Sequence, residues 1–126
     1  MLKRINFQSL PVADQQRALE FYRDALGFDV HTDAPYEGGA RWIFMVIPGA
    51  ETMLHLQPGT PAPRSDGPAL CLVTDDVDAE ADRLRTLGVA FGQEPTKAPW
   101  NPNVRFALFD DSEGNLVMMQ SSELED

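Results

Sequence analysis

The chain has 126 residues, 43% of them hydrophobic, which is enough for one compact domain with its own core. Its formal net charge of −10 disfavours nucleic acid and anionic membranes as partners. No apolar run approaches the roughly 18 residues needed to span a bilayer, and none follows Lys3-Arg4 as in a secretory signal. The single cysteine, Cys71, excludes an intrachain disulfide, so we expect a cytoplasmic protein.

The first half of the chain predicts a strand, a helix and three further strands. A strand at residues 5–10 should end at Pro11, because proline lacks the backbone donor of a sheet. Asp14 is the expected N-cap of the helix, and Gly27 its expected stop. The apolar stripe of that helix is Ala18, Phe21, Tyr22, Ala25 and Leu26. A loop is expected at 33–40, and the other strands at 28–32, 41–47 and 52–57.

The second half predicts the same order of elements after a linker. Residues 58–68 hold four prolines and two glycines, so no regular structure is expected there. Asp75 and Asp76 both suit the start of the second helix, and Gly88 should stop it. Its expected buried stripe is Val77, Ala81, Leu84 and Leu87. Strands are expected at 69–74, 89–92, 104–109 and 116–120, with a long loop at 93–103 that holds Trp100.

The two halves repeat each other. An offset of 61 residues places Val12 on Val73, Asp14 on Asp75 and Gly27 on Gly88. We therefore predict a single α+β domain of two βαβββ modules. The first module is residues 1–57, the linker 58–68 and the second module 69–126. A ligand site is expected between the copies.

The repeated stretches resemble the vicinal oxygen chelate superfamily, which includes glyoxalases, bleomycin-resistance proteins and extradiol dioxygenases. The resemblance rests on Val12-Ala-Asp14, Phe21-Tyr22, Leu26-Gly27-Phe28, Asp75-Asp76-Val77, Gly88-Val89 and 109–115, where Ser112 stands in place of the family's proline. It implies curved mixed sheets that enclose a cleft, commonly within a homodimer. In the enzymes of the family, that cleft holds a divalent metal.

The metal ligands of the family do not carry over to this chain. The resemblance places the four ligand positions on Phe7, His55, Ala69 and Met118. Only His55 offers a suitable donor, whereas a catalytic metal typically needs three protein ligands. Gln8 lies one residue from Phe7, but a slip of one residue turns a strand side chain to the other face. We expect no metal and no other cofactor.

The cleft is expected to bind an organic ligand. Strand alternation puts Met53, His55 and Gln57 on one face. The expected ligand-binding residues are Phe7, Trp42, Met53, His55, Gln57, Cys71, Trp100, Arg105, Met118 and Gln120. Alternatives stay open: these side chains could fill the cavity as core, His55 could be a structural histidine, and Arg105 could form a surface salt bridge. Cys71 is expected to be a buried, inert thiol.

The leading hypothesis is a metal-independent small-molecule binding protein of the bleomycin-resistance type, acting as a homodimer. A drug-sequestering role is one form of this hypothesis, and the net charge favours a cationic ligand. The alternative is a glyoxalase-like lyase or isomerase, or a dioxygenase, acting on a small organic substrate. His55 is the one candidate catalytic residue for it, so enzymatic activity is left open. A third hypothesis is an interaction module that only presents a dimer surface.

Overall fold

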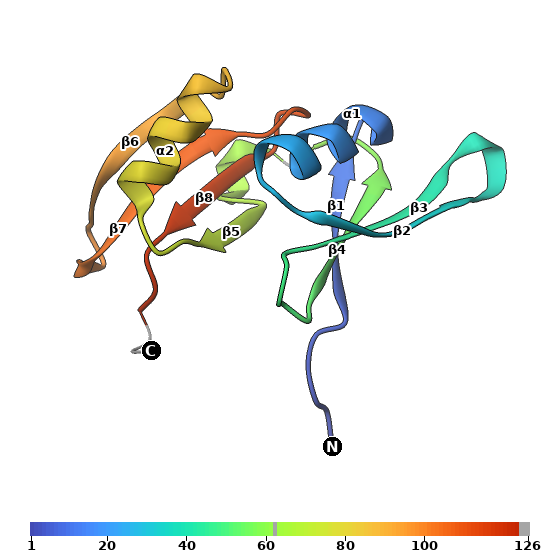
Figure 1. Cartoon of the computed structure of the whole chain (residues 1–126), viewed down its shortest axis with the longest axis horizontal. Helices are drawn as coiled ribbons and strands as arrows, with labels where there is room; N and C mark the ends of the chain where they lie inside the picture. The colour runs from blue at the N-terminus through green and yellow to red at the C-terminus, as the bar shows by residue number, and fades with distance from the viewer. Residues whose placement is uncertain (62, 124–126) are drawn as a thin grey trace. The chain divides into compact units, whose positions relative to one another are not determined.

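The computed structural model describes residues 1–61 and 63–123, and it divides the chain into two compact units, Met1–Ala62 and Pro63–Asp126 (Figure 1). Each unit holds one four-stranded mixed sheet and one α-helix. The predicted α+β fold of two modules is therefore confirmed. No described helix combines the length and apolar character required to cross a membrane.

The sheet of the first unit has the strand order β1-β4-β3-β2. β1 pairs in parallel with β4, and the other pairs are antiparallel. The strands are β1 (Phe7–Val12), β2 (Asp29–Pro35), β3 (Arg41–Val46) and β4 (Met53–Pro58). The prediction that Pro11 ends the first strand is wrong. β1 continues to Val12, because an edge strand tolerates the missing donor of proline on its open side.

The first helix has two parts. α1 (Gln15–Glu20) starts at Asp14, whose side chain accepts a hydrogen bond from the Arg17 amide at 3.0 Å, as predicted. A π-helical turn (Phe21–Ala25) continues it, and Gly27 ends it with a φ of 80°. The buried side chains are Ala18, Leu19, Tyr22 and Ala25. The expected stripe therefore gains Leu19, while Phe21 and Leu26 lie only partly buried.

The sheet of the second unit has the order β5-β8-β7-β6, again with one parallel edge pair, β5 and β8. Its strands are β5 (Leu70–Val73), β6 (Phe91–Ala98), β7 (Asn101–Asp110) and β8 (Leu116–Gln120). α2 (Val77–Thr86) buries Val77, Ala81 and Leu84. Leu87 was expected in this stripe but is 55% exposed, because it is the C-cap and lies beyond the last helical turn.

The predicted loop at residues 93–103 is wrong. These residues extend β6 and β7 into a long hairpin whose turn holds Pro99 and Trp100. β6 is an edge strand, and its pairing with β7 shifts register between Gln93 and Thr96, which accommodates Pro95. The end of β2 at Pro35 likewise takes in residues that were expected to be loop. The linker is also more regular than expected, because Arg64–Asp66 forms a 3₁₀ turn.

The two helices do not match at a single offset. Their N-caps are Asp14 and Asp76, which are 62 positions apart, whereas their stop glycines, Gly27 and Gly88, are 61 apart. The predicted match of Asp14 to Asp75 is therefore displaced by one residue. The extra residue of the first helix lies in the π-helical turn, where the Leu26 amide bonds back five residues to the Phe21 carbonyl at 3.2 Å.

Candidate functional site

The first unit contains a pocket of about 450 Å³ on its sheet. β4 supplies one wall through strand alternation: Leu54 and Leu56 are buried in the core, whereas His55 and Gln57 line the pocket. β1, β3 and the turn between β2 and β3 supply the rest. The lining residues are Phe7, Ser9, Tyr36, Glu37, Ala40, Arg41, Trp42, His55, Gln57 and Pro58.

Aromatic rings form a continuous wall across three strands. Trp42 and Phe44 project from the same face of β3, with centroids 6.0 Å apart and planes 10° apart. The imidazole of His55 lies 5.0 Å from Phe44 and 5.1 Å from Trp42. Phe7 from β1 meets both His55 and Phe44 edge-on, at 5.7 and 5.1 Å. Tyr36 continues the wall, 4.6 Å from Trp42. Such a surface favours a flat or cationic organic ligand.

His55 is the buried polar group of this wall. Its side chain is 7% exposed, and Ser9 Oγ lies 3.1 Å from Nδ1. Ser9 and His55 are register partners on the parallel strands β1 and β4, which fixes this contact. Burial lowers the pKa of His55 below its ordinary value, so the ring is neutral near pH 7.

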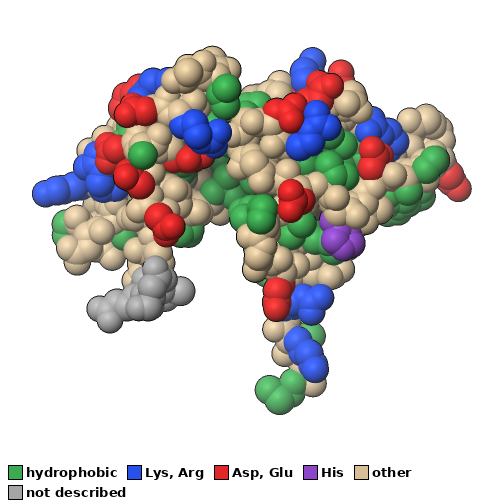
Figure 2. Space-filling model, in the orientation of Figure 1, with side chains coloured by type: hydrophobic (Ala, Val, Ile, Leu, Met, Phe, Trp, Pro, Cys, Tyr) green, Lys and Arg blue, Asp and Glu red, His purple; other side chains and the backbone are tan. Residues whose placement is uncertain are grey.

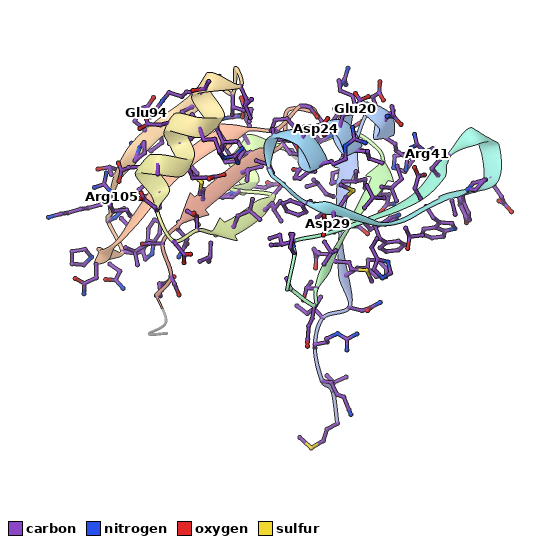
Figure 3. The ribbon with its side chains drawn as sticks, in the orientation of Figure 1. Glu20, Asp24, Asp29, Arg41, Glu94 and Arg105 are labelled. Atoms are coloured by element: carbon purple, nitrogen blue, oxygen red, sulfur yellow. The ribbon has the colours of Figure 1, made fainter. Side chains whose placement is uncertain are left out.

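The charges around the pocket are unequally paired. The Arg41 guanidinium donates from Nε and Nη2 to both oxygens of Asp33, at 3.0 and 2.7 Å, and from Nη1 to Gln16. This pairing raises the pKa of Arg41 and lowers the pKa of Asp33. Figure 3 labels Arg41 beside the β2–β3 hairpin. Glu37 also lines the pocket, and none of the ion pairs found among the described residues includes it. The net charge of the side chains around the pocket is therefore negative.

Gln15, in the first turn of α1, ties the helix to two strands of the pocket. Its Nε2 donates to the carbonyls of Arg41 and Leu56 at 2.7 and 2.8 Å, and its Oε1 accepts from the Arg41 amide at 3.0 Å. These bonds hold β3 and β4 at the point where Arg41 and Gln57 enter the pocket wall. Sequence reasoning did not single out Gln15, because nothing in its local pattern distinguishes it from Gln16.

The structure brings four of the predicted ligand-binding residues together in this pocket: Phe7, Trp42, His55 and Gln57. Met53 lies on the same strand as His55 but is not part of the lining. Sequence reasoning missed Tyr36 and Glu37, which fall in a predicted loop, and Phe44, which alternation along β3 could have placed beside Trp42.

The other predicted residues lie in the second unit. Cys71 and Met118 are register partners on β5 and β8, and Cys71 Sγ donates to Gln120 Oε1 at 3.4 Å. Trp100 lies 5.1 Å from Phe106. The guanidinium of Arg105, labelled in Figure 3, lies on the surface. It donates two hydrogen bonds of 2.8 Å to Asp78 of α2, so Arg105 forms the surface salt bridge that was its alternative role.

The expectation that Cys71 is buried is wrong. The residue is exposed, because it lies on an edge strand and on the face that α2 does not cover. Packing around the sulfur and the negative charge of Glu123 nevertheless raise the pKa of the thiol. Cys71 is therefore accessible but protonated near neutral pH.

The donor set does not fit the divalent metal of the family enzymes. Of the four expected ligand positions, Phe7 and His55 lie in the first unit and Ala69 and Met118 in the second, and His55 alone carries a suitable donor. Within residues 1–61 and 63–123, no three His, Cys, Asp or Glu side chains gather to hold a metal ion.

Comparison with known proteins identifies the family. Residues 4–119 match the model of the Glyoxalase/Bleomycin resistance protein/Dioxygenase superfamily, and the chain belongs to it. The Bacillus subtilis (strain 168) protein YurT is 39% identical, over 92% of this chain and 97% of its own.

Solved structures agree with this assignment. TnmS3, an antibiotic binding protein from Streptomyces sp. CB03234, is 36% identical with a TM-score of 0.82, over 97% of this chain and 98% of its own. A superfamily member from Sphaerobacter thermophilus DSM 20745 is 28% identical with a TM-score of 0.84, over 96% and 98%.

Proposed function

We propose that this protein binds a small aromatic organic molecule with a positive charge, without a metal, in the pocket of the first unit. The observation that carries the proposal is the aromatic wall of Phe7, Trp42, Phe44 and His55, with Glu37 beside it. The likeness to TnmS3 supports small-molecule binding. We further propose that the protein sequesters a drug in the cytoplasm.

The electrostatics of the pocket support a cationic ligand. Asp33 neutralises Arg41, and burial keeps His55 neutral, so Glu37 supplies the uncompensated charge. Tyr36 and Trp42 line the same pocket as Glu37, and the faces of aromatic rings attract positive charge. The net charge of the whole chain, −10, adds a long-range attraction. Figure 2 shows acidic side chains interspersed with basic ones on the visible face.

The contributions of the Trp42 ring and the Glu37 charge to binding can be tested separately. Trp42→Ala should weaken binding of 9-aminoacridine, a flat cation, by about 10-fold, because it removes the central ring of the wall. Glu37→Gln should weaken it by about 3-fold at low salt and less at high salt, because an exposed charge is screened. Isothermal titration calorimetry measures both.

Two controls accompany this measurement. Glu51→Gln removes an exposed acid outside the pocket and should leave the affinity unchanged. Acridine-9-carboxylate, which has the same ring with a negative charge, should bind more weakly than the cation. Equal affinity for the two dyes, or no effect of Trp42→Ala, would contradict the proposal.

Metal independence is tested on untagged protein. Dialysis against EDTA should leave the affinity for 9-aminoacridine unchanged. Near-stoichiometric zinc, nickel, iron or manganese by elemental analysis would favour the metal-dependent lyase, isomerase or dioxygenase hypothesis instead.

A further inference from the structure

The sheet of the first unit divides at the end that carries the pocket. β3 pairs with β2 as far as Arg41, and β4 pairs with β1 as far as Pro58. Between β3 and β4, the last register pair towards this end among the described residues is Phe44–His55. Beyond that pair the sheet continues as two ribbons, β1–β4 and β2–β3. Figure 1 shows the β2–β3 hairpin extending away from the other two strands.

The pocket lies where the two ribbons separate. Its lining residues all belong to one ribbon or to the other: His55, Gln57 and Pro58 enter from β4, whereas Arg41 and Trp42 enter from β3. A ligand that fills the pocket therefore touches both ribbons. The spacing of the ribbons decides how well a wide ligand contacts both at once.

Pro58 prevents the ladder between β3 and β4 from closing at the far end of this split. Three steps along each antiparallel strand from Phe44–His55 (44 − 3 = 41 and 55 + 3 = 58) would bring Arg41 opposite Pro58. Proline has no backbone N–H, so the Arg41 carbonyl cannot receive a ladder hydrogen bond there.

The side-chain amide of Gln15 supplies the bonds that the ladder lacks. Its Nε2 donates to the Arg41 carbonyl at 2.7 Å and to the Leu56 carbonyl at 2.8 Å, and its Oε1 accepts from the Arg41 amide at 3.0 Å. One half-buried side chain thus joins the backbones of both ribbons. Gln15 is the first residue of α1, directly after the N-cap Asp14, so the bridge is anchored on the helix.

We propose that Gln15 is a positioning residue for the ligand, because it holds the two ribbons at the separation that a wide aromatic ring system requires. Trp42 and His55 come from different ribbons, and their ring centroids lie 5.1 Å apart to form one wall. Without the bridge the ribbons can move relative to each other, so a ligand that touches both must order them as it binds. The inference rests on the binding function proposed above.

The bridge itself is tested without a ligand, by amide hydrogen exchange measured with NMR. In Gln15→Leu, the Arg41 amide should exchange about 10-fold faster relative to that of Met45, which stays in the β3–β4 ladder. Gln16→Leu is the matched control, because the hydrogen bonds of Gln16 go to the side chains of Arg41 and Glu20 rather than to the backbone. Equal relative exchange in the wild type and Gln15→Leu would overturn the bridge.

The effect on binding is measured with 9-aminoacridine and 4-aminoquinoline, two cations that differ by one fused ring. In Gln15→Leu, the affinity for 9-aminoacridine should fall by about 5-fold and that for 4-aminoquinoline by less than about 2-fold. Gln15→Glu is nearly isosteric but has no donor for the carbonyls of Arg41 and Leu56, so it should lower the ratio of the two affinities in the same way. Gln16→Leu should keep the wild-type ratio.

The outcomes separate the positioning role from the function it rests on. Isothermal titration calorimetry is carried out where circular dichroism shows each variant to be folded, so a loss of stability alone leaves both affinities unchanged. An unchanged ratio in Gln15→Leu and Gln15→Glu would overturn the positioning role while small-molecule binding stands. If the wild type binds neither dye, the binding function fails together with the positioning role, and the Arg41 exchange alone decides whether the bridge exists.

Discussion

At the scale of single residues, His55 combines a buried ring with a lowered pKa. The charged and titratable groups that share its pocket are Tyr36, Glu37 and Arg41, and Arg41 is paired with Asp33. Desolvation therefore dominates, and the folded protein resists protonation of this ring more than the unfolded chain does.

This difference predicts how stability depends on pH. Because the folded pKa of His55 is lower than the unfolded value of about 6.5, the unfolded chain binds the proton more readily. The contribution of neutral His55 to the free energy of unfolding is complete above pH 6.5. It is lost as the pH falls from there towards the folded pKa. Urea denaturation at pH 7.5 and 5.5 should show a smaller loss of unfolding free energy in His55→Gln than in the wild type. An equal loss in both proteins would contradict the assignment.

Gln15 offers a second prediction at this scale. Gln15→Leu removes three hydrogen bonds and leaves the Arg41 amide without its partner. We expect a loss of about 2 kcal/mol in unfolding free energy. The neighbouring Gln16→Leu is the control: its hydrogen bonds, to the side chains of Arg41 and Glu20, are exposed, so their loss should cost less than about 0.5 kcal/mol. Chemical denaturation of the two variants compares them directly, and equal losses would show that the bridge does not stabilise the unit.

At the scale of elements, local signals predicted the helix ends well. Asp14 and Gly27 bound the first helix through contacts made within a few residues, and such contacts are visible in sequence. The β6–β7 hairpin was missed because its prolines read as loop. The tolerance of Pro95 depends on β6 lying at a sheet edge, which only the assembled sheet determines.

The pocket residues that lie on regular strands could be predicted from the sequence, whereas those in a turn could not. Alternation along β4 placed His55 and Gln57 on one face, and the resemblance pointed to Phe7. Glu37 and Tyr36 enter the pocket from the turn between β2 and β3. Their position depends on Gly38 and Gly39, both with positive φ, and on the Tyr36 amide bonding to the Ala40 carbonyl at 2.9 Å. Such a turn leaves no periodic pattern of apolar residues in the sequence.

At the scale of the whole molecule, each sheet leaves two edges: β1 and β2 in the first unit, β5 and β6 in the second. Open edges and exposed apolar side chains such as Val73 and Trp100 favour association. We therefore propose a homodimer.

Native mass spectrometry should find a species of twice 14.0 kDa at micromolar concentration. If apolar contacts hold the dimer together, it should stay intact in analytical ultracentrifugation as the salt concentration is raised. If ion pairs hold it together, salt should shift it to monomer. A species of 14.0 kDa alone across the concentration range would refute dimerisation.

The π-helical turn at Phe21–Ala25 bears on how this chain arose. If the two modules are copies of one ancestral segment, one residue gained in the first helix or lost from the second accounts for their different helix lengths. From N-cap to stop glycine the first copy spans 13 positions and the second 12. Deleting one residue between 21 and 25 would equalise the two, and the turn would be expected to revert to regular α-helix.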